Sequence, residues 1–148
     1  MKIHRKGFAQ WHGGFKDGRG TITTQSGALK AYPYGVSSRF EGTPGTNPEE
    51  LLAAAHAGCF TMALSSVLGE ASLTATQMDT SAEVTLESVP GGYAITAVHL
   101  ALQARIEGVD PQTFERLVAV AKENCPVSKV LNATITLEAE LLSGPPVG

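Results

Sequence analysis

Two thiols are the residues of this sequence best suited to chemistry. Cys59 lies near the middle of NPEELLAAAHAGCFTMAL (residues 47–64), and Cys125 opens CPVSKVL (residues 125–131). Two cysteines can be inert core residues, a structural disulfide, part of a metal site or a redox pair. Structural zinc sites usually contain a close pair such as Cys-x-x-Cys, which this sequence lacks, so we expect no metal. The other three readings stay open on spacing alone.

The local setting of the two thiols differs. Cys125 precedes Pro126 and is expected to cap a short helix, where the helix dipole and free amide hydrogens lower a thiol pKa. Cys59 is expected in mid-helix among alanines, where a lone cysteine usually acts as a small hydrophobic residue. Local chemistry therefore favours Cys125 as the more acidic thiol.

Two neighbouring glutamates lie on different faces of the helix expected around Cys59. Asn47 is a suitable N-cap and Glu50 stands three residues later, the pattern of a capping box. At about 100° per residue, Glu50 lies about 180° from Cys59, whereas Glu49 lies only about 80° away. We therefore assign Glu50 to the cap, and Glu49 remains available to hold a cation that could act on the thiol.

His56 shares the face of Cys59, about 60° away around the same helix. This spacing allows a Cys–His nucleophile, as in a transferase or thioesterase that is acylated on Cys59. A single histidine on an apolar face is more often a hydrogen-bonded core residue. The many small residues of this helix predict close approach by another helix and burial on most sides.

The composition limits the classes of protein. The 148 residues suit a single domain, 1–148, and 43% are hydrophobic and 17% charged, as in ordinary globular proteins. A net charge of −3 without a basic stripe gives no reason to expect nucleic acid. We find no apolar signal core after Met1 and no apolar run of the ~18 residues that a membrane span needs. We expect a cytoplasmic protein, in which a purely structural disulfide is disfavoured.

Residue periodicity predicts an α+β domain. Strands are expected at 3–11 and 18–27 as a hairpin, and residues 28–42 are expected to form a loop or edge strand. A helix should run from 47 to about 68 or 69, followed by a hairpin of strands 76–89 and 92–106 around Pro90-Gly91-Gly92. A second helix should start after the N-cap Asp110, with Pro111 first, followed by a short helix from Pro126 and a strand at 133–142.

Several stretches together resemble the OsmC/Ohr family of thiol peroxidases, and within it the OsmC branch. They are GTNPEELLAAAHAGCFTMALS around Cys59, NCPVSKVLNATITLEAEL around Cys125, and YPYGVSSRFEG around Arg39. IHRKGFAQWHG and GTITTQSG near the N-terminus also fit, so the resemblance covers essentially the full length. It implies an OsmC-like α+β fold, with antiparallel sheets around two central cysteine-bearing helices, built as an intertwined homodimer.

The resemblance also implies a reaction, the reduction of organic hydroperoxides and of hydrogen peroxide to alcohol and water. Cys59 matches the thiol that attacks the peroxide, and Cys125 matches the thiol that resolves the sulfenic acid as an intramolecular disulfide. Arg39 and Glu49 match the assisting arginine and glutamate; without the resemblance they would pass for a surface arginine and a first-turn acid. A dithiol, in this family reported as a lipoylated protein, is the expected reductant, and no cofactor is expected.

A reading from another class is a non-enzymatic dimer that binds a hydrophobic ligand or a stress partner and merely buries its cysteines. It predicts thiols that do not react with peroxide. In the peroxidase reading, four aromatic residues are candidates to line an apolar entry for an alkyl hydroperoxide: Tyr32, Tyr34, Phe40 and Phe60. Phe60, on the cysteine helix, is the one better explained as core.

Overall fold

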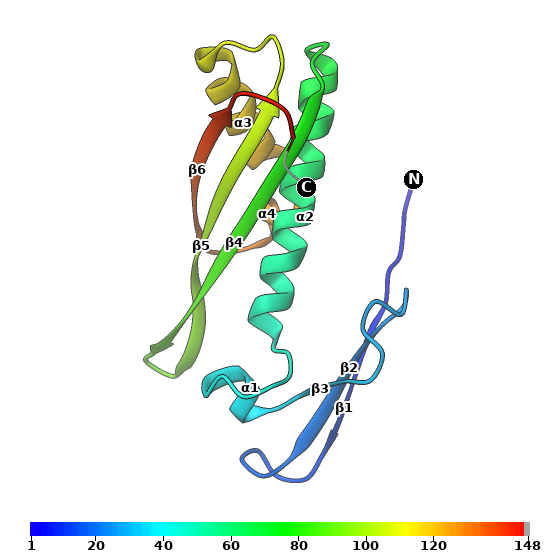
Figure 1. Cartoon of the computed structure of the whole chain (residues 1–148). Helices are drawn as coiled ribbons and strands as arrows, with labels where there is room; N and C mark the ends of the chain where they lie inside the picture. The colour runs from blue at the N-terminus through cyan, green and yellow to red at the C-terminus, as the bar shows by residue number, and fades with distance from the viewer. Residues whose placement is uncertain (147–148) are drawn as a thin grey trace. The chain divides into compact units, whose positions relative to one another are not determined.

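A computed structural model describes residues 1–146, in which residues 1–51 and residues 52–146 form two compact units. Each unit has its own three-stranded sheet, and the fold is α+β, as predicted (Figure 1). That residues 1–148 act as one domain stays a prediction.

The first unit is an antiparallel sheet in the order β1-β2-β3, followed by a short helix. The predicted hairpin is confirmed as β1 (Gly7–His12) and β2 (Arg19–Thr24), in which Gly7 pairs with Thr24 and His12 with Arg19. The next segment, expected as a loop or edge strand, contains the edge strand β3 (Tyr32–Tyr34) and the helix α1 (Val36–Phe40). Arg39 therefore lies on a helix and not on a loop.

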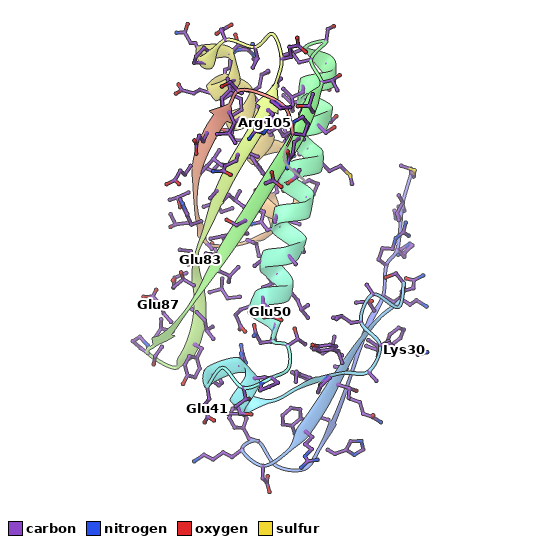
Figure 2. The ribbon with its side chains drawn as sticks, viewed as in Figure 1. Lys30, Glu41, Glu50, Glu83, Glu87 and Arg105 are labelled. Carbon is purple, nitrogen blue, oxygen red and sulfur yellow. The ribbon has the colours of Figure 1, made fainter. Side chains whose placement is uncertain are left out.

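The second unit is a three-stranded sheet covered on one face by helices. β4 (Ala75–Val89) and β5 (Gly92–Ile106) form the long hairpin that the Pro90-Gly91 turn predicts, with Glu83 and Glu87 along β4 (Figure 2). β6 (Thr134–Leu142) pairs with β5 in parallel. The expectation of purely antiparallel sheets is therefore wrong for this edge, because the chain crosses over through two helices before it returns.

The helices of this unit follow their capping signals. α3 (Pro111–Asn124) starts after Asp110, whose carboxylate accepts hydrogen bonds from the Thr113 amide and hydroxyl, both at 2.8 Å. α4 (Pro126–Val130) follows at once, so Cys125 is both the C-cap of α3 and the N-cap of α4. Of the two expected cysteine-bearing helices, only the one with Cys59 carries its thiol within the helix.

The core of the second unit lies between the sheet and the helices. Alternate residues of β5 point inward, as their period of two predicts. They pack on α2 (Pro48–Glu70) and α3. The buried members include Phe60, Leu64, Val98, Leu100, Phe114 and Val118. Phe60 is completely buried, which makes it a core residue and removes it from the aromatic candidates for a substrate entry.

The α2 helix departs from two expectations. It is long and apolar enough, by length and composition alone, to cross a membrane, contrary to the expectation that no run reaches that length. Phe60, Leu64 and Leu68 on one face of this helix belong to the core, although only 22% of the apolar window is buried in the single chain. Its small-residue side, including Ala54, Gly58 and Met62, is exposed, so burial on most sides is wrong for the single chain.

Candidate active site

An ion pair in the first unit joins the end of α1 to the start of α2. The Arg39 guanidinium donates from Nη2 to Oε1 of Glu49 at 2.6 Å, and its Nε lies 3.1 and 3.2 Å from the two carboxylate oxygens. The Glu49 side chain is 11% exposed, whereas that of Arg39 is 35% exposed. A carboxylate with so little water needs a partner, and the guanidinium fork supplies two donors while it keeps part of its surface open.

The turn before α2 holds this pair in place. The Ser38 hydroxyl accepts a hydrogen bond from the Gly35 amide at 2.9 Å and donates to the Thr46 carbonyl at 2.8 Å. Gly45 sits against Ser38 with φ +136°, where a Cβ would come within 2.9 Å of the Ser38 side chain. Only glycine adopts this backbone at so close an approach. The segment therefore folds back and brings Arg39 to Glu49.

Glu50, the neighbouring glutamate, takes part in the helix start instead. Its amide donates to the Asn47 side chain at 2.8 Å, which confirms Asn47 as the cap. Its carboxylate accepts from the Thr46 hydroxyl at 2.8 Å, one residue before the amide that a capping box would use. The predicted division between Glu49 and Glu50 is confirmed, although the reciprocal half of the box has a different donor.

An apolar cavity of about 320 Å³ lies beside Arg39 within the first unit. Of the aromatic candidates, Tyr34 and Phe40 line it, but Tyr32 does not. Trp11 and Phe15 also line it, and the Trp11 ring meets that of Tyr34 edge-on at 5.6 Å between centroids. The cavity combines aromatic walls with one cation, a setting suited to a small ligand that has an apolar body and a polar end.

The two thiols lie together in the second unit. Both are free, and they are near enough that each thiol affects the pKa of the other. Cys125 is fully buried, whereas Cys59 is partly exposed. The structure thus places close together two cysteines that are far apart in the sequence, on α2 and at the α3–α4 junction.

The thiols differ in acidity. Burial raises the pKa of Cys59, and its hydrogen bond with Cys125 raises it further. Burial also acts to raise the pKa of Cys125, but hydrogen bonds from Cys59, from the amide and hydroxyl of Ser128 and from the Val127 amide outweigh it, and the pKa is lowered. Within this unit Cys125 is the more acidic thiol, as its position at a helix start predicts.

His56, on α2, is a further buried group close to the thiols. Its ring is completely buried, and its Nε2 lies 2.8 Å from the Ser128 hydroxyl. The other ring nitrogen, Nδ1, is buried without a hydrogen-bond partner in the described structure. Neither ring nitrogen bonds to Cys59 in the described structure, so the direct Cys59–His56 pair of the transferase reading is not formed.

The buried imidazole of His56 should make the stability of the fold depend on pH. Burial lowers the pKa of His56 below its ordinary 6.5. The unfolded chain then binds this proton more tightly, so the free energy of unfolding should fall as the pH drops from about 6.5 toward the lowered pKa, and should not change from this group above 6.5. Urea unfolding of wild type and His56→Gln between pH 8 and pH 5 measures it. In His56→Gln the free energy of unfolding should fall less with decreasing pH than in the wild type. An equal fall in both proteins would contradict the assignment. His12→Gln, at an exposed histidine, is the control and should behave like the wild type.

Sequence reasoning named the thiols, the ion pair and half of the aromatic wall, but missed Trp11, Phe15 and Ser128. Trp11 lies on β1 and Phe15 in the hairpin loop, where a lone aromatic has no periodic signal of its own. Ser128 stands three residues after Cys125, the spacing at which a helical side chain can reach back to a cap, and that signal could have been used.

Comparison with known protein families and relatives identifies the family of this chain. The family model for OsmC-like proteins matches residues 40–140. The sequence is 52% identical over 143 residues to Peroxiredoxin OsmC of Escherichia coli (strain K12), covering 97% of this chain and all of that protein. It is also 30% identical over 123 residues to the organic hydroperoxide resistance protein OhrB of Bacillus subtilis, covering 82% and 88% of the two chains.

Solved structures give the same fold. The crystal structure of OhrB of Bacillus subtilis matches with a TM-score of 0.70 at 29% identity, covering 93% of this chain and 98% of that one. An OsmC-like protein of unknown function from Vibrio cholerae matches with a TM-score of 0.75 at 19% identity, covering 93% and 99%, and supports the fold alone. On sequence and fold together, this chain belongs to the OsmC family.

Proposed function

We propose that this chain reduces organic hydroperoxides, and hydrogen peroxide, to alcohol and water, with Cys59 as the attacking thiol and Cys125 as the resolving thiol. Membership of the OsmC family and the 52% identity to a protein named a peroxiredoxin make it a thiol peroxidase. The observation that carries the assignment of residues is the close approach of a partly exposed thiol and a fully buried one.

The proposed reaction has two steps. The Cys59 thiolate attacks the terminal peroxide oxygen, so that an S–O bond forms, the O–O bond breaks and the departing alkoxide takes a proton to become the alcohol. Cys59 is then a sulfenic acid. Cys125 attacks its sulfur, the S–S bond forms, and the sulfenic oxygen leaves as water. An external dithiol reduces the disulfide and restores both thiols.

Access favours Cys59 for the first step. A peroxide must reach the sulfur in line with its O–O bond, and the sulfur of Cys125 has no exposed surface in the resting protein. Cys59 offers that access but not the acidity, because its surroundings in the second unit raise its pKa. Activation of Cys59 therefore requires a positive charge from outside that unit.

In the proposal, Arg39 supplies this charge and Glu49 aims it. A guanidinium stays charged at any working pH and can donate to the thiolate and to a peroxide oxygen together. Its partly exposed edge leaves donors free for that purpose while Glu49 holds the other edge. The aromatic cavity beside Arg39 would take the alkyl or aryl group of the substrate.

The assembly and the reductant are also part of the proposal. We expect a homodimer, which the exposed small-residue side of α2 supports because alanine and glycine allow two helices to approach closely. We expect residues 1–148 to act as one OsmC-like domain, recycled by a dithiol such as a lipoylated protein. Two free thiols that must be returned to the reduced state suit the cytoplasm.

The pairing of the thiols has a direct test. One equivalent of cumene hydroperoxide should convert the reduced protein to an intramolecular Cys59–Cys125 disulfide, because the thiols are already close together. Non-reducing peptide mapping by mass spectrometry identifies the linked peptides, and dithiothreitol should reverse the change. Thiols that remain free under these conditions would contradict the proposal and favour the ligand-binding reading.

A further inference from the structure

The contact between His56 and Ser128 is not explained by the two-thiol reaction as it stands. A fully buried histidine at 2.8 Å from a serine hydroxyl, with its second nitrogen unpartnered, is an uncommon element in an apolar core. Burial lowers the pKa of His56, so its imidazole is neutral near pH 7 and carries one N–H. The position of that hydrogen decides what Ser128 can do.

The unpartnered nitrogen assigns the tautomer. A buried N–H without an acceptor is rarer and less tolerable than a buried acceptor without a donor. Nδ1, which has no partner in the described structure, is therefore the bare nitrogen, and Nε2 carries the hydrogen. Nε2–H then donates to the Ser128 oxygen, which leaves the hydrogen of the Ser128 hydroxyl to be donated elsewhere.

The acceptor for that hydrogen is the sulfur of Cys125. Ser128 stands on the first turn of α4, three residues after Cys125, and its hydroxyl is one of the groups that lower the pKa of the Cys125 thiol. The order of donors is thus His56 on α2, then Ser128 on α4, then the sulfur at the start of α4. All members lie in the second unit, and the thiol at the end of the series is a neighbour of Cys59 that affects its pKa.

We propose that His56 and Ser128 form a donor relay that prepares Cys125 for the resolving step, with Ser128 stabilising the thiolate and His56 fixing the direction of the serine hydroxyl. The inference rests on the proposed function, since it assigns the relay to the second of its two steps. There the Cys125 thiolate attacks the Cys59 sulfur, the S–O bond breaks as the S–S bond forms, and the proton released by Cys125 ends on the departing oxygen as water. Cys125 is oxidised and the Cys59 sulfenic sulfur is reduced. His56 acts through Ser128 and is a positioning residue.

Separate measurement of the two steps tests the relay. Reduced protein is mixed with one equivalent of cumene hydroperoxide and quenched in acid at increasing times. Loss of hydroperoxide reports the attack by Cys59, and mass spectrometry of alkylated samples reports disulfide formation. In Ser128→Ala, disulfide formation should slow by roughly 10- to 100-fold, the worth of one hydrogen bond to a charged group. Hydroperoxide loss should slow far less, so that the Cys59 sulfenic acid accumulates.

Conservative variants distinguish a relay from simple packing. Ser128→Thr keeps the hydroxyl and should retain most of the resolving rate, whereas Ser128→Ala should also move the pH dependence of that rate to higher pH. His56→Gln keeps a donor and should resemble wild type more closely than His56→Phe. Ser88→Ala, at an exposed serine of β4, is the matched control.

The outcomes separate this inference from the proposed function. If the wild type forms the disulfide but Ser128→Ala resolves at the same rate with the same pH profile, the relay is wrong and the peroxidase is retained. If the wild type does not consume hydroperoxide through Cys59, the proposed function itself fails. If an alanine or phenylalanine variant does not fold, Ser128→Thr and His56→Gln are measured at high and low pH instead. The relay predicts that both variants keep the pH profile of the resolving rate of the wild type, and a shifted profile in either variant would contradict it.

Discussion

Replacing Cys59 with serine should abolish peroxidase turnover, with a fall of roughly three orders of magnitude or more in kcat/KM. A serine hydroxyl is not ionised near neutral pH and attacks peroxide oxygen poorly, whereas a thiolate is the reactive form of sulfur. Coupled turnover with a dithiol and cumene hydroperoxide measures the effect. Full activity in Cys59→Ser would overturn the assignment of the attacking thiol.

Cys125→Ser is the matched comparison, because it removes the other half of the same pair. It should consume about one equivalent of hydroperoxide per chain and then stop or slow, since the Cys59 sulfenic acid has no internal thiol to condense with. A single-turnover burst with loss of steady-state rate is the expected signature. The two variants thus fail at different steps, which inert buried cysteines would not do.

Loss of the guanidinium at position 39 should have the second large effect. Arg39→Met is expected to lower kcat/KM by roughly 10²- to 10³-fold, the usual cost of removing a donor aimed at charge in the reacting groups. Arg39→Lys keeps the charge but not the fork, and it should recover part of the rate. The pH dependence of the attack should shift to higher pH in Arg39→Met, because the variant lacks the cation that we propose stabilises the Cys59 thiolate. Stopped-flow measurement of hydroperoxide loss across pH tests both points.

The two adjacent glutamates provide an internal control for this prediction. Glu49→Gln should reduce the rate by roughly 10- to 100-fold, because a guanidinium displaced by about 1 Å from its working position costs on that order. Glu50→Gln changes the adjacent glutamate, which bonds to the Thr46 hydroxyl and to the Asn47 cap. The rate of this variant should stay near that of the wild type. Equal losses in both variants would show that the effect arises from the helix start and not from the Arg39–Glu49 pair.

Much of the fold could be predicted because its signals are local. The caps at Asn47 and Asp110 and the turn at Pro90-Gly91 set the limits of long periodic segments, and those helices and strands are confirmed. Two features could not be predicted from such local signals. The parallel pairing of β6 with β5 depends on the crossover, and the exposed side of α2 depends on what covers it, because neither is encoded in a single segment.

The site was predictable to a different degree at each residue. Helical spacing alone separated Glu49 from Glu50, and the position of Cys125 before a proline indicated the more acidic thiol. Helical spacing also placed His56 on the face of Cys59, but it could not show that the imidazole turns to Ser128, which lies far away in the sequence. Contacts of this kind arise from tertiary packing, so only the folded chain reveals them.

The two thiols differ in acidity in a way that bears on the two steps of the proposed reaction. Within the second unit the fully buried Cys125 is the more acidic and the partly exposed Cys59 the less acidic. In the proposed mechanism, attack through Cys59 therefore needs a cation, whereas the more acidic Cys125 serves the second step. The proposal gives Arg39 a role in the attack and the His56–Ser128 relay a role in the resolution, so variants of the two groups should slow different steps.

The identity of the first oxidised sulfur is the most direct test of the central claim. Cys125→Ser and Cys59→Ser proteins are each treated with one equivalent of cumene hydroperoxide in the presence of dimedone, and the labelled peptide is identified by mass spectrometry. We predict rapid labelling of Cys59 in the first protein and little labelling of Cys125 in the second. Rapid labelling of Cys125 in Cys59→Ser, with Cys59 unlabelled in Cys125→Ser, would contradict the account.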